Sequence, residues 1–193
     1  MKLVLATNNR GKLKELSEIA AAADWLQLEL APAEFDPEET GETFVDNAIL
    51  KAAEAARMTG QLAVADDSGI EVEALGGAPG IYSARYCQGS DADRRAKLLQ
   101  AIAGVADENR GANFVCCMAV CDPSGAVLHT CCAKWHGQII REERGENGFG
   151  YDPIFFLADL NLTAAQISSE QKNSLSHRGQ AWRAILDYLN SIK

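Results

Sequence analysis

The sequence lacks any apolar stretch long enough to cross a bilayer, and its N-terminal apolar run, at residues 2–6, is too short for a secretory signal. We therefore expect a cytoplasmic protein without a membrane partner. The chain also lacks internal repeats, low-complexity segments and a Pro/Gly/Ser-rich linker. Its 193 residues are enough for one well-buried core, so we expect a single domain over residues 1–193.

Positive charge is scarce. The chain has 18 Lys and Arg residues against 27 Asp and Glu residues, which gives a formal net charge of −9. Nucleic-acid binding needs an extended basic face, so this balance argues against a DNA or RNA partner. A single nucleotide stays compatible with it, because a metal ion and a few converging Lys and Arg side chains can offset the charge of a polyphosphate locally.

Paired metal-binding cysteines are also missing. The six cysteines include no C-x₂-C pair, so a zinc site with His129 or His136 is disfavoured. In a chain of this size without a secretory signal, reduced thiols are the expected state, and buried ones would act as small hydrophobic residues. The cysteines are Cys87, Cys116, Cys117, Cys121, Cys131 and Cys132.

The composition that is present, 47% apolar and 23% charged, is typical of a folded globular protein. In the first third of the chain, the patterns predict a strand, a polar loop, a helix, a second strand, an acidic loop and a second helix. Their expected ranges are 2–6, 7–11, 12–23, 26–30, 34–42 and 43–58, and Gly60 should close the second helix.

The remaining patterns predict a β-rich middle and a C-terminal helix. An apolar strand should end in a polar elbow at residues 66–69, and two or three strands should span 112–140 with a turn at 122–125. Helices are expected over 91–104 and 177–192, and a glycine-rich loop should lead into a short strand after residue 153. This order predicts a mixed α/β fold with helices around a central sheet.

The first candidate site is the polar loop after the opening strand, with Thr7, Asn9, Lys12 and Glu15. Small polar residues at a helix N-terminus offer backbone N–H groups to phosphate oxygens, and Lys12 adds a positive charge one turn further on. The spacing of a Walker A loop is absent. A capped surface loop with a solvated lysine is an equally open interpretation.

The second candidate site is acidic and consists of Glu38, Glu39, Asp66 and Asp67. Carboxylates in loops are suitable ligands for magnesium, and one of them can take a proton from an attacking water. Two adjacent carboxylates at the end of an apolar strand rarely stabilise a fold, because like charges near a core repel. The alternatives are a turn cap for the aspartates and a solvated loop for the glutamates.

Two further sets lie near the C-terminus. Lys172, Ser176, His177 and Arg178 precede or open the last helix, where basic residues oppose the helix dipole unless an anion or a polar ligand lies there. In the segment 148–153, GFGYDP, glycines flank aromatic residues on which a purine base can stack. Ordinary surface charge and core aromatic residues are the alternatives.

Taken in order, five segments resemble the inosine triphosphate pyrophosphatase family, also called the XTP/dITP diphosphatases. They are TNNRGKLKEL (7–16), EETGETFVDNAILKA (38–52), VADDSGIEVEALGGAPGIYSARY (64–86), GFGYDPIFF (148–156) and EQKNSLSHRGQA (170–181). The resemblance covers almost the whole chain. It implies an elongated α/β fold with a mixed central sheet and two lobes around a nucleotide cleft, usually in a homodimer.

The resemblance also implies an activity: magnesium-dependent hydrolysis of ITP, dITP and XTP to the monophosphate and pyrophosphate, with Mn²⁺ as a possible substitute. Glu39 and Asp67 would be the metal-associated carboxylates, with Asp67 as proton acceptor and Asp66 in support. The substrate contacts carried over by the resemblance are Thr7, Asn8, Asn9, Arg10, Gly11, Lys12, Ser68, Phe149, Gly150, Tyr151, Asp152, Lys172, His177 and Arg178. Asn8 stands where the family often has glycine, and Glu42 is a second small departure.

Two alternatives to this enzyme stay open at the level of sequence. One is a related pyrophosphatase, such as the Maf-like proteins that act on modified pyrimidine nucleotides. The other is a non-catalytic nucleotide-binding module, which the phosphate loop and the aromatic segment would suffice to build. The Asp66-Asp67 pair disfavours the second, because a binder gains little from a carboxylate beside a phosphate.

Overall fold

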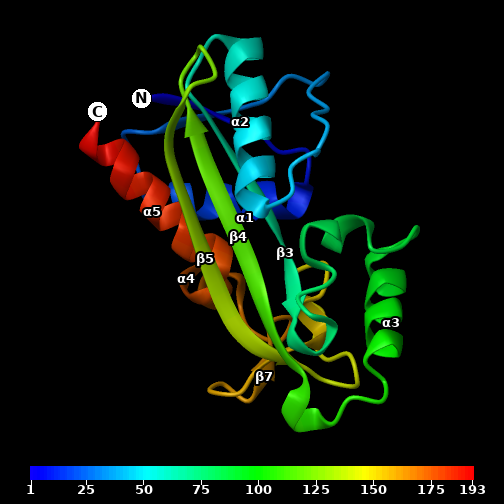
Figure 1. Ribbon diagram of the computed structural model, residues 1–193. Coiled ribbons are helices and arrows are strands. Elements are labelled where there is room, and N and C mark those ends of the chain that lie inside the picture. The colour runs from blue at the N-terminus through cyan, green and yellow to red at the C-terminus, as the bar shows by residue number, and fades with distance from the viewer. The chain divides into compact units, whose positions relative to one another are not determined.

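The computed structural model describes all residues from Met1 to Lys193. Its strands are β1 (Lys2–Leu5), β2 (Gln27–Leu30), β3 (Ala63–Val72), β4 (Gly111–Cys121), β5 (Val127–Ile139), β6 (Phe155–Leu157) and β7 (Leu162–Thr163). Its α-helices are α1 (Arg10–Ala20), α2 (Phe44–Thr59), α3 (Asp91–Ala101), α4 (Ser169–Leu175) and α5 (His177–Ser191). Figure 1 shows their course along the chain. No helix has both the length and the apolar character needed to span a membrane.

The strands form one seven-stranded sheet in the order β2-β1-β3-β4-β5-β6-β7. β1 runs parallel to both β2 and β3, whereas β6 is antiparallel to β5 and to β7. A sheet with both kinds of pairing and helices packed on it is the mixed α/β architecture expected from the sequence, and this fold class is confirmed.

The chain divides into two compact units. Unit 1 contains Met1–Asp67, Cys116–Ala133 and His177–Lys193, and unit 2 contains Ser68–Val115 and Lys134–Ser176. Strands β3, β4 and β5 each contribute residues to both units. The single domain and the nucleotide cleft expected from the sequence stay predictions.

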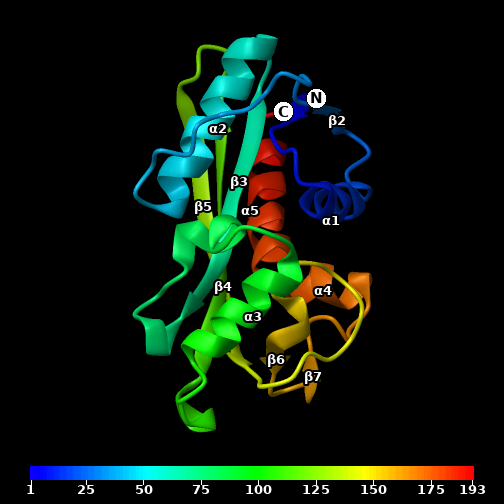
Figure 2. The ribbon, with the colours of Figure 1, turned by 90° about the vertical axis from the view of Figure 1, so that its right-hand side faces the viewer.

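In unit 1, helices cover both faces of the strands. Residues of α1 and α5 pack with Leu3, Leu5 and Val64, whereas the alanines of α2 pack with Val4 and Ala63. Side chains alternate between the two faces along a strand, which explains how neighbouring residues belong to different clusters. Figure 2 shows α2 on one side of β3 and α5 on the other.

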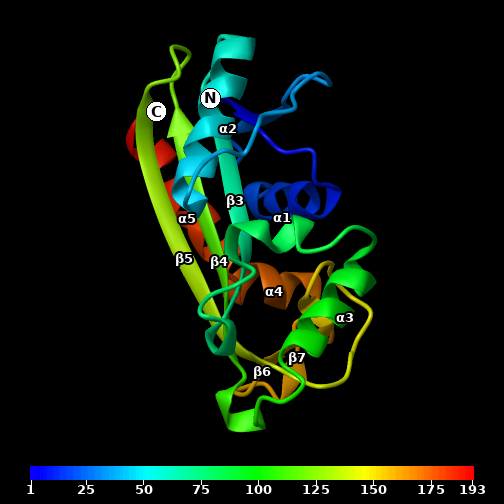
Figure 3. The same ribbon diagram turned by 45° about the vertical axis from the view of Figure 1, so that its right-hand side comes forward.

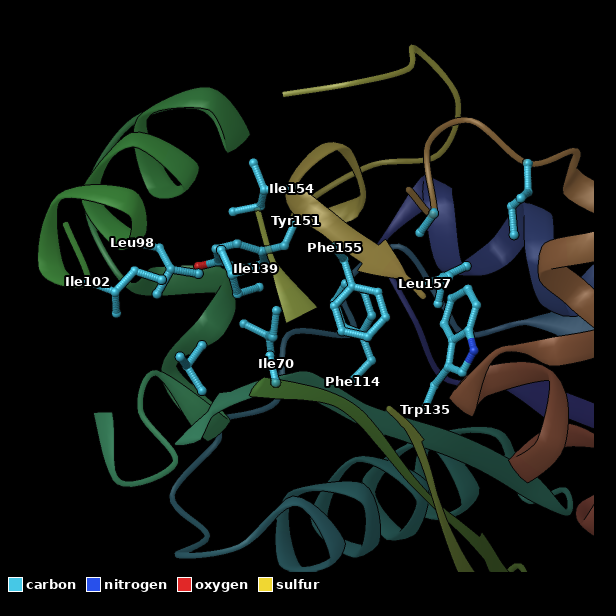
Figure 4. Packing of buried hydrophobic residues seen from close by; sticks show 14 residues of the cluster. Ile70, Leu98, Ile102, Phe114, Trp135, Ile139, Tyr151, Ile154, Phe155 and Leu157 are labelled. Atoms are coloured by element: carbon cyan, nitrogen blue, oxygen red, sulfur yellow. The ribbon is translucent and has the colours of Figure 1, made fainter. Parts of the chain in front are cut away.

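Unit 2 has its own apolar core. The ring of Phe114 lies 4.3 Å from that of Phe155 and 6.4 Å from that of Trp135, measured between centroids. Leu98 of α3 and Ile102, which directly follows this helix, are fully buried in the same cluster. Figure 4 shows the three rings together, with Leu98 and Ile102 beside Ile139. This core fixes α3 and the segment that enters β6.

Local signals explain several helix ends. Thr43 and Asp46 form a capping box at the start of α2, and Gly60 ends it in the left-handed conformation at φ 63°, as predicted. α1 begins earlier than predicted, because the Asn9 side chain caps it by accepting hydrogen bonds from the N–H groups of Gly11 and Lys12. Arg10 and Gly11 are therefore helical residues and do not belong to the loop.

The predicted elbow at residues 66–69 is wrong. β3 runs without interruption through Asp66, Asp67, Ser68 and Gly69. The polar residues suggested a break, but buried cations compensate the two carboxylates, so the strand can keep its ladder of hydrogen bonds. The short helix α4, which carries Lys172, was not predicted either. Its signal is the capping box formed by Ser168 and Gln171.

The expectation of six reduced thiols is also wrong. Cys117 of β4 and Cys132 of β5 form a disulfide, and the other four cysteines are free. β4 and β5 are neighbours in the sheet, and the Cα atoms of the two cysteines lie 4.1 Å apart. Spacing in the sequence did not reveal which cysteines lie side by side, because that depends on the strand register.

Candidate active site

Asp66 and Asp67 are buried on β3, with 3% and 5% of their surfaces exposed. Successive side chains of a strand point to opposite faces, so the two carboxylates meet different helices. Asp66 contacts side chains from α1 and α5, whereas Asp67 contacts side chains from α2. The two carboxylates therefore have different hydrogen-bond and ion-pair partners, although they follow each other on one strand.

Cations surround Asp66. Its Oδ2 lies 3.0 Å from Lys12 Nζ and 3.4 Å from Arg178 Nε, and Glu15 Oε2 holds the other side of that guanidinium at 2.6 Å from Nη1. Burial acts to raise the pKa of Asp66, but the charges of Lys12, Arg178 and Lys51 outweigh it and lower the pKa far below its usual range. A lowered pKa keeps Asp66 ionised at neutral pH and makes it a poor proton acceptor.

Asp67 has a different environment. Lys51 Nζ donates to its Oδ1 at 2.8 Å, and Asn47 Nδ2 donates to its Oδ2 at 3.3 Å. Lys51 also bonds Glu39 Oε1 at 2.9 Å, so one ammonium group joins the two carboxylates. Burial raises the pKa of Asp67 despite the opposing charge of Lys51. A carboxylate with a raised pKa is the better proton acceptor of the two.

Sequence reasoning missed Asn47 and Lys51 and gave Glu15 no role. Asn47 and Lys51 lie four residues apart on α2 and are buried on the face that otherwise carries alanines. A polar pair that interrupts an apolar helix face is the signal that could have identified them. Glu15 follows Lys12 by three residues, which places both side chains on one face of α1.

The loop before α1 differs from the predicted phosphate cradle. The N–H groups of Gly11 and Lys12 both donate to Asn9 Oδ1, at 2.9 and 3.1 Å, and Asn9 N–H donates to Thr7 Oγ1 at 3.2 Å. Asn8 Nδ2 donates to the carbonyl of Phe35 at 2.7 Å. The cap therefore uses two of the amides expected to face phosphate, and Lys12 is the cation that this segment provides.

Unit 2 carries the aromatic set. Asp152 accepts a hydrogen bond from Phe149 N–H at 2.9 Å and pairs with Lys172, whose Nζ lies 4.8 Å from the centre of the Phe149 ring. Tyr151 is a core residue: its hydroxyl donates to the Ser83 carbonyl at 2.8 Å, and burial raises its pKa. The structure thus brings Phe149, Asp152 and Lys172 together.

The remaining predicted residues take ordinary places in these elements. Ser68 follows Asp67 on β3, and His177 begins α5 directly before Arg178 and is 3% exposed. Gly150 has both of its polar backbone groups bonded to side chains of α3. Its part in any binding site is therefore to shape the loop.

Few side chains of the site could ligate a metal ion. No group of three or more His, Cys, Asp or Glu side chains in the structure could hold one. Glu39 and Asp67 nevertheless converge on a single cation, Lys51. Magnesium is commonly held by one or two carboxylates together with substrate phosphates, so these two residues fit a metal that arrives with a polyphosphate.

A strand that presents one stable anion and one basic carboxylate, with lysines from two helices, has the features of a hydrolytic phosphate site. The comparisons with known proteins agree with this class. The model of the Ham1 family matches residues 3–188, so the chain belongs to the Ham1 family.

Individual relatives extend over the same length. The dITP/XTP pyrophosphatase of Desulforamulus reducens is 47% identical over 196 residues, which cover 100% of this chain and 97% of that protein. The dITP/XTP pyrophosphatase of Gloeobacter violaceus is 50% identical and covers 95% of this chain and 92% of its own. Among solved structures, a HAM1 protein from Coxiella burnetii has a TM-score of 0.88 at 42% identity and covers 99% of both chains.

Proposed function

We propose that this protein hydrolyses deaminated purine nucleoside triphosphates, namely ITP, dITP and XTP, to the monophosphate and pyrophosphate, and so removes them from the nucleotide pool. The observation that carries the proposal is the arrangement on β3, where Lys12 and Arg178 hold Asp66 while Lys51 joins Asp67 to Glu39. The names of the relatives, dITP/XTP pyrophosphatase, supply the substrate class.

In the proposed reaction, water attacks the α-phosphorus while Asp67 accepts its proton. The new bond joins the water oxygen to the α-phosphorus, and the bond from that phosphorus to the α–β bridging oxygen breaks, so that pyrophosphate leaves with the electron pair. Lys12, Lys51 and Lys172 provide positive charge for the phosphates. Glu39 and Asp67 would hold Mg²⁺, or Mn²⁺ in its place, which when bound neutralises negative charge on the leaving group.

Base selection is assigned to Phe149 and Asp152 together with His177 and Arg178, and Tyr151 supports Phe149 from the core of unit 2. A 6-keto purine offers a hydrogen-bond acceptor at the position where adenine has an amino group, so a donor aimed at O6 excludes adenine. His177 and Arg178 are buried at the start of α5 and are the proposed donors. The aromatic ring of Phe149 would stack on the base.

The proposal includes a homodimer in the cytoplasm, with a nucleotide as the ligand and neither nucleic acid nor membrane as a partner. The charge of −9 supports the choice of a single nucleotide, since it disfavours a polyanionic surface partner. Size-exclusion chromatography with light scattering tests the dimer, and a mass of one chain at micromolar concentration contradicts it.

The decisive assay offers ITP, XTP, dITP, ATP and GTP separately with Mg²⁺ and follows both phosphate products. We expect pyrophosphate as the first product, and a kcat/KM for the three deaminated substrates at least about 100-fold above that for ATP. Equal rates on all five nucleotides, or orthophosphate as the first product, would refute the proposal.

A further inference from the structure

The peptide groups on both sides of Gly150 are held by one helix. Gly150 N–H donates to Asp91 Oδ2 at 2.8 Å, and Gly150 C=O accepts from Arg95 Nη1 at 2.8 Å. Gly150 has a φ of 61°, a conformation that favours glycine. Because the two bonds fix the peptide planes that flank one α-carbon, α3 sets the backbone direction between Phe149 and Tyr151.

Arg95 uses an almost buried charge for this contact. Its side chain is 12% exposed, and its Nη2 bonds Glu143 Oε2 at 2.9 Å, which ties a second point of the same connection to α3. Its buried Nε–H has no hydrogen-bond partner. The two terminal nitrogens of its guanidinium thus join α3 to this segment at two points.

Asp91 is held as an anion at the start of the helix. Burial acts to raise the pKa of Asp91, but the hydrogen bonds from Arg94 and from the Gly150 amide outweigh it and lower the pKa. Its Oδ1 bonds Arg94 Nη2 at 2.6 Å, which leaves Oδ2 for Gly150. A charged acceptor makes a stronger bond to a backbone N–H than a neutral one does.

Helix α3 is a firm platform for these two residues. A capping box of Ser90 and Asp93 begins the helix, and Leu98 is fully buried in the core of unit 2. Figure 3 shows α3 beside the yellow segment that leads to the loop of Phe149, Gly150 and Tyr151. On its other side, the loop is fixed by the Tyr151 hydroxyl on the Ser83 carbonyl.

From this geometry we infer that Asp91 and Arg95 are positioning residues for nucleotide binding: they hold Gly150 so that the Phe149 ring presents its face to the base. The inference rests on the proposed function and adds to it the residues that set affinity for the base. It places no contact between α3 and the substrate. The two hydrogen bonds that join Asp91 and Arg95 to Gly150, here called the clamp, orient the loop and not the proton acceptor Asp67. Loss of the clamp should therefore change KM and leave kcat nearly intact.

The test compares Arg95→Ala with Glu143→Gln. The first removes the bond to the Gly150 carbonyl, and the second removes the charge of the other partner of Arg95 and leaves Gly150 bonded. We expect Arg95→Ala to raise KM for ITP about tenfold with kcat within about twofold, since a bond to a charged group is worth roughly that factor. Glu143→Gln should leave KM within about twofold of wild type.

Amide hydrogen exchange gives a readout without substrate. The Gly150 amide should exchange faster in Asp91→Ala than in wild type, because its acceptor is gone, whereas Glu143→Gln should not change it. If exchange rises but neither Asp91→Ala nor Arg95→Ala changes KM, the inference is wrong and the proposed function stands. If wild type shows no preference for ITP over ATP, the proposed function fails, and exchange at Gly150 still reports whether the clamp exists.

An equal rise in KM for Glu143→Gln and Arg95→Ala would overturn the inference, because it would assign the effect to the ion pair and not to Gly150. A fall in kcat at unchanged KM in Arg95→Ala would also overturn it. Thermal unfolding of each variant confirms that kinetics are compared among folded proteins.

Discussion

The two neighbouring aspartates differ in what they can do because they face different helices. Asp66 meets Lys12 and Arg178, and its charge is fixed, whereas Asp67 meets Lys51 and Asn47, and its pKa is raised. Proton transfer from water needs an acceptor of raised pKa, and charge compensation needs one that never protonates. The two roles can therefore be tested by separate substitutions.

Asp67→Asn should abolish turnover. The amide keeps the shape of the side chain but cannot accept a proton from water, so kcat should fall by about 10²- to 10⁴-fold while nucleotide binding stays within about tenfold of wild type. Steady-state kinetics and isothermal titration with a non-hydrolysable nucleotide measure the two quantities. Activity near the wild-type level would remove Asp67 from the role of proton acceptor.

Asp66→Asn should act first on stability. The substitution leaves Lys12 and the buried guanidinium of Arg178 without the charge between them, and breaking a buried ion pair in this way costs about 3 kcal/mol. Urea denaturation measures the loss. The matched control is Lys134→Gln, which breaks the partly exposed pair with Glu71 and should cost less than about 1 kcal/mol. Equal decreases in the free energy of unfolding would show that the ion pairs of Asp66 contribute no more to stability than an exposed pair does.

At the scale of elements, the sequence predicted the order of strands and helices well where signals are local. Gly60 marked the end of α2, and the turn at 122–125 marked the change from β4 to β5. The prediction that the strand ends at Asp66 was wrong, because Arg178, the partner of Asp66, lies 112 residues further along the chain. Such a partner overrides local polarity and cannot be read from a window of neighbouring residues.

The strands β4 and β5 carry a prediction of their own. Protein purified without reductant and then denatured should show four reactive thiols, because Cys117 and Cys132 are joined, and six after reduction. Their separation of 15 residues closes a loop that is worth up to about 3 kcal/mol in the unfolded state, so reduction should lower the free energy of unfolding by at most that amount.

Thiol titration in guanidinium and urea denaturation with and without reductant check both statements. Cys132→Ser serves as the control, since it should show five thiols with or without reductant. Six thiols in the unreduced wild type would contradict the disulfide.

On the scale of the whole molecule, the residue types of the candidate site could be predicted but their pairing could not. Lys12 and Glu39 were selected from the sequence as a cation and an acid, yet neither pattern showed that Lys12 meets Asp66 or that Lys51 joins Glu39 to Asp67. These pairs form only when α1, α2 and β3 pack together. The packing of the fold therefore determines which carboxylate has a raised pKa, whereas the composition shows only that carboxylates are present.

Metal dependence can be tested on the whole protein, because removal of a structural metal lowers its stability and removal of a metal that arrives with the substrate does not. A structural metal contributes on the order of 10 kcal/mol to folding, so chelation would unfold the protein. Glu39 and Asp67 are already paired with Lys51, so the fold does not need a metal to hold them, and we expect EDTA to abolish turnover while changing Tm by less than about 2 °C. Differential scanning calorimetry and the pyrophosphate assay on the same sample measure both effects.

Substitution of two neighbouring glutamates distinguishes metal binding at a specific carboxylate from attraction of Mg²⁺ by the overall negative charge of the protein. Glu39 bonds Lys51 beside Asp67, whereas Glu38 is exposed in the same acidic loop. Glu39→Gln should raise the Mg²⁺ concentration for half-maximal activity by about tenfold, because one of two carboxylates is lost, and Glu38→Gln should leave it unchanged. Both variants lose one negative charge, so a shift of equal size in the two would assign the effect to the overall field of an acidic protein. A shift in Glu39→Gln alone would place the metal at the carboxylates joined by Lys51, on the α2 face of β3.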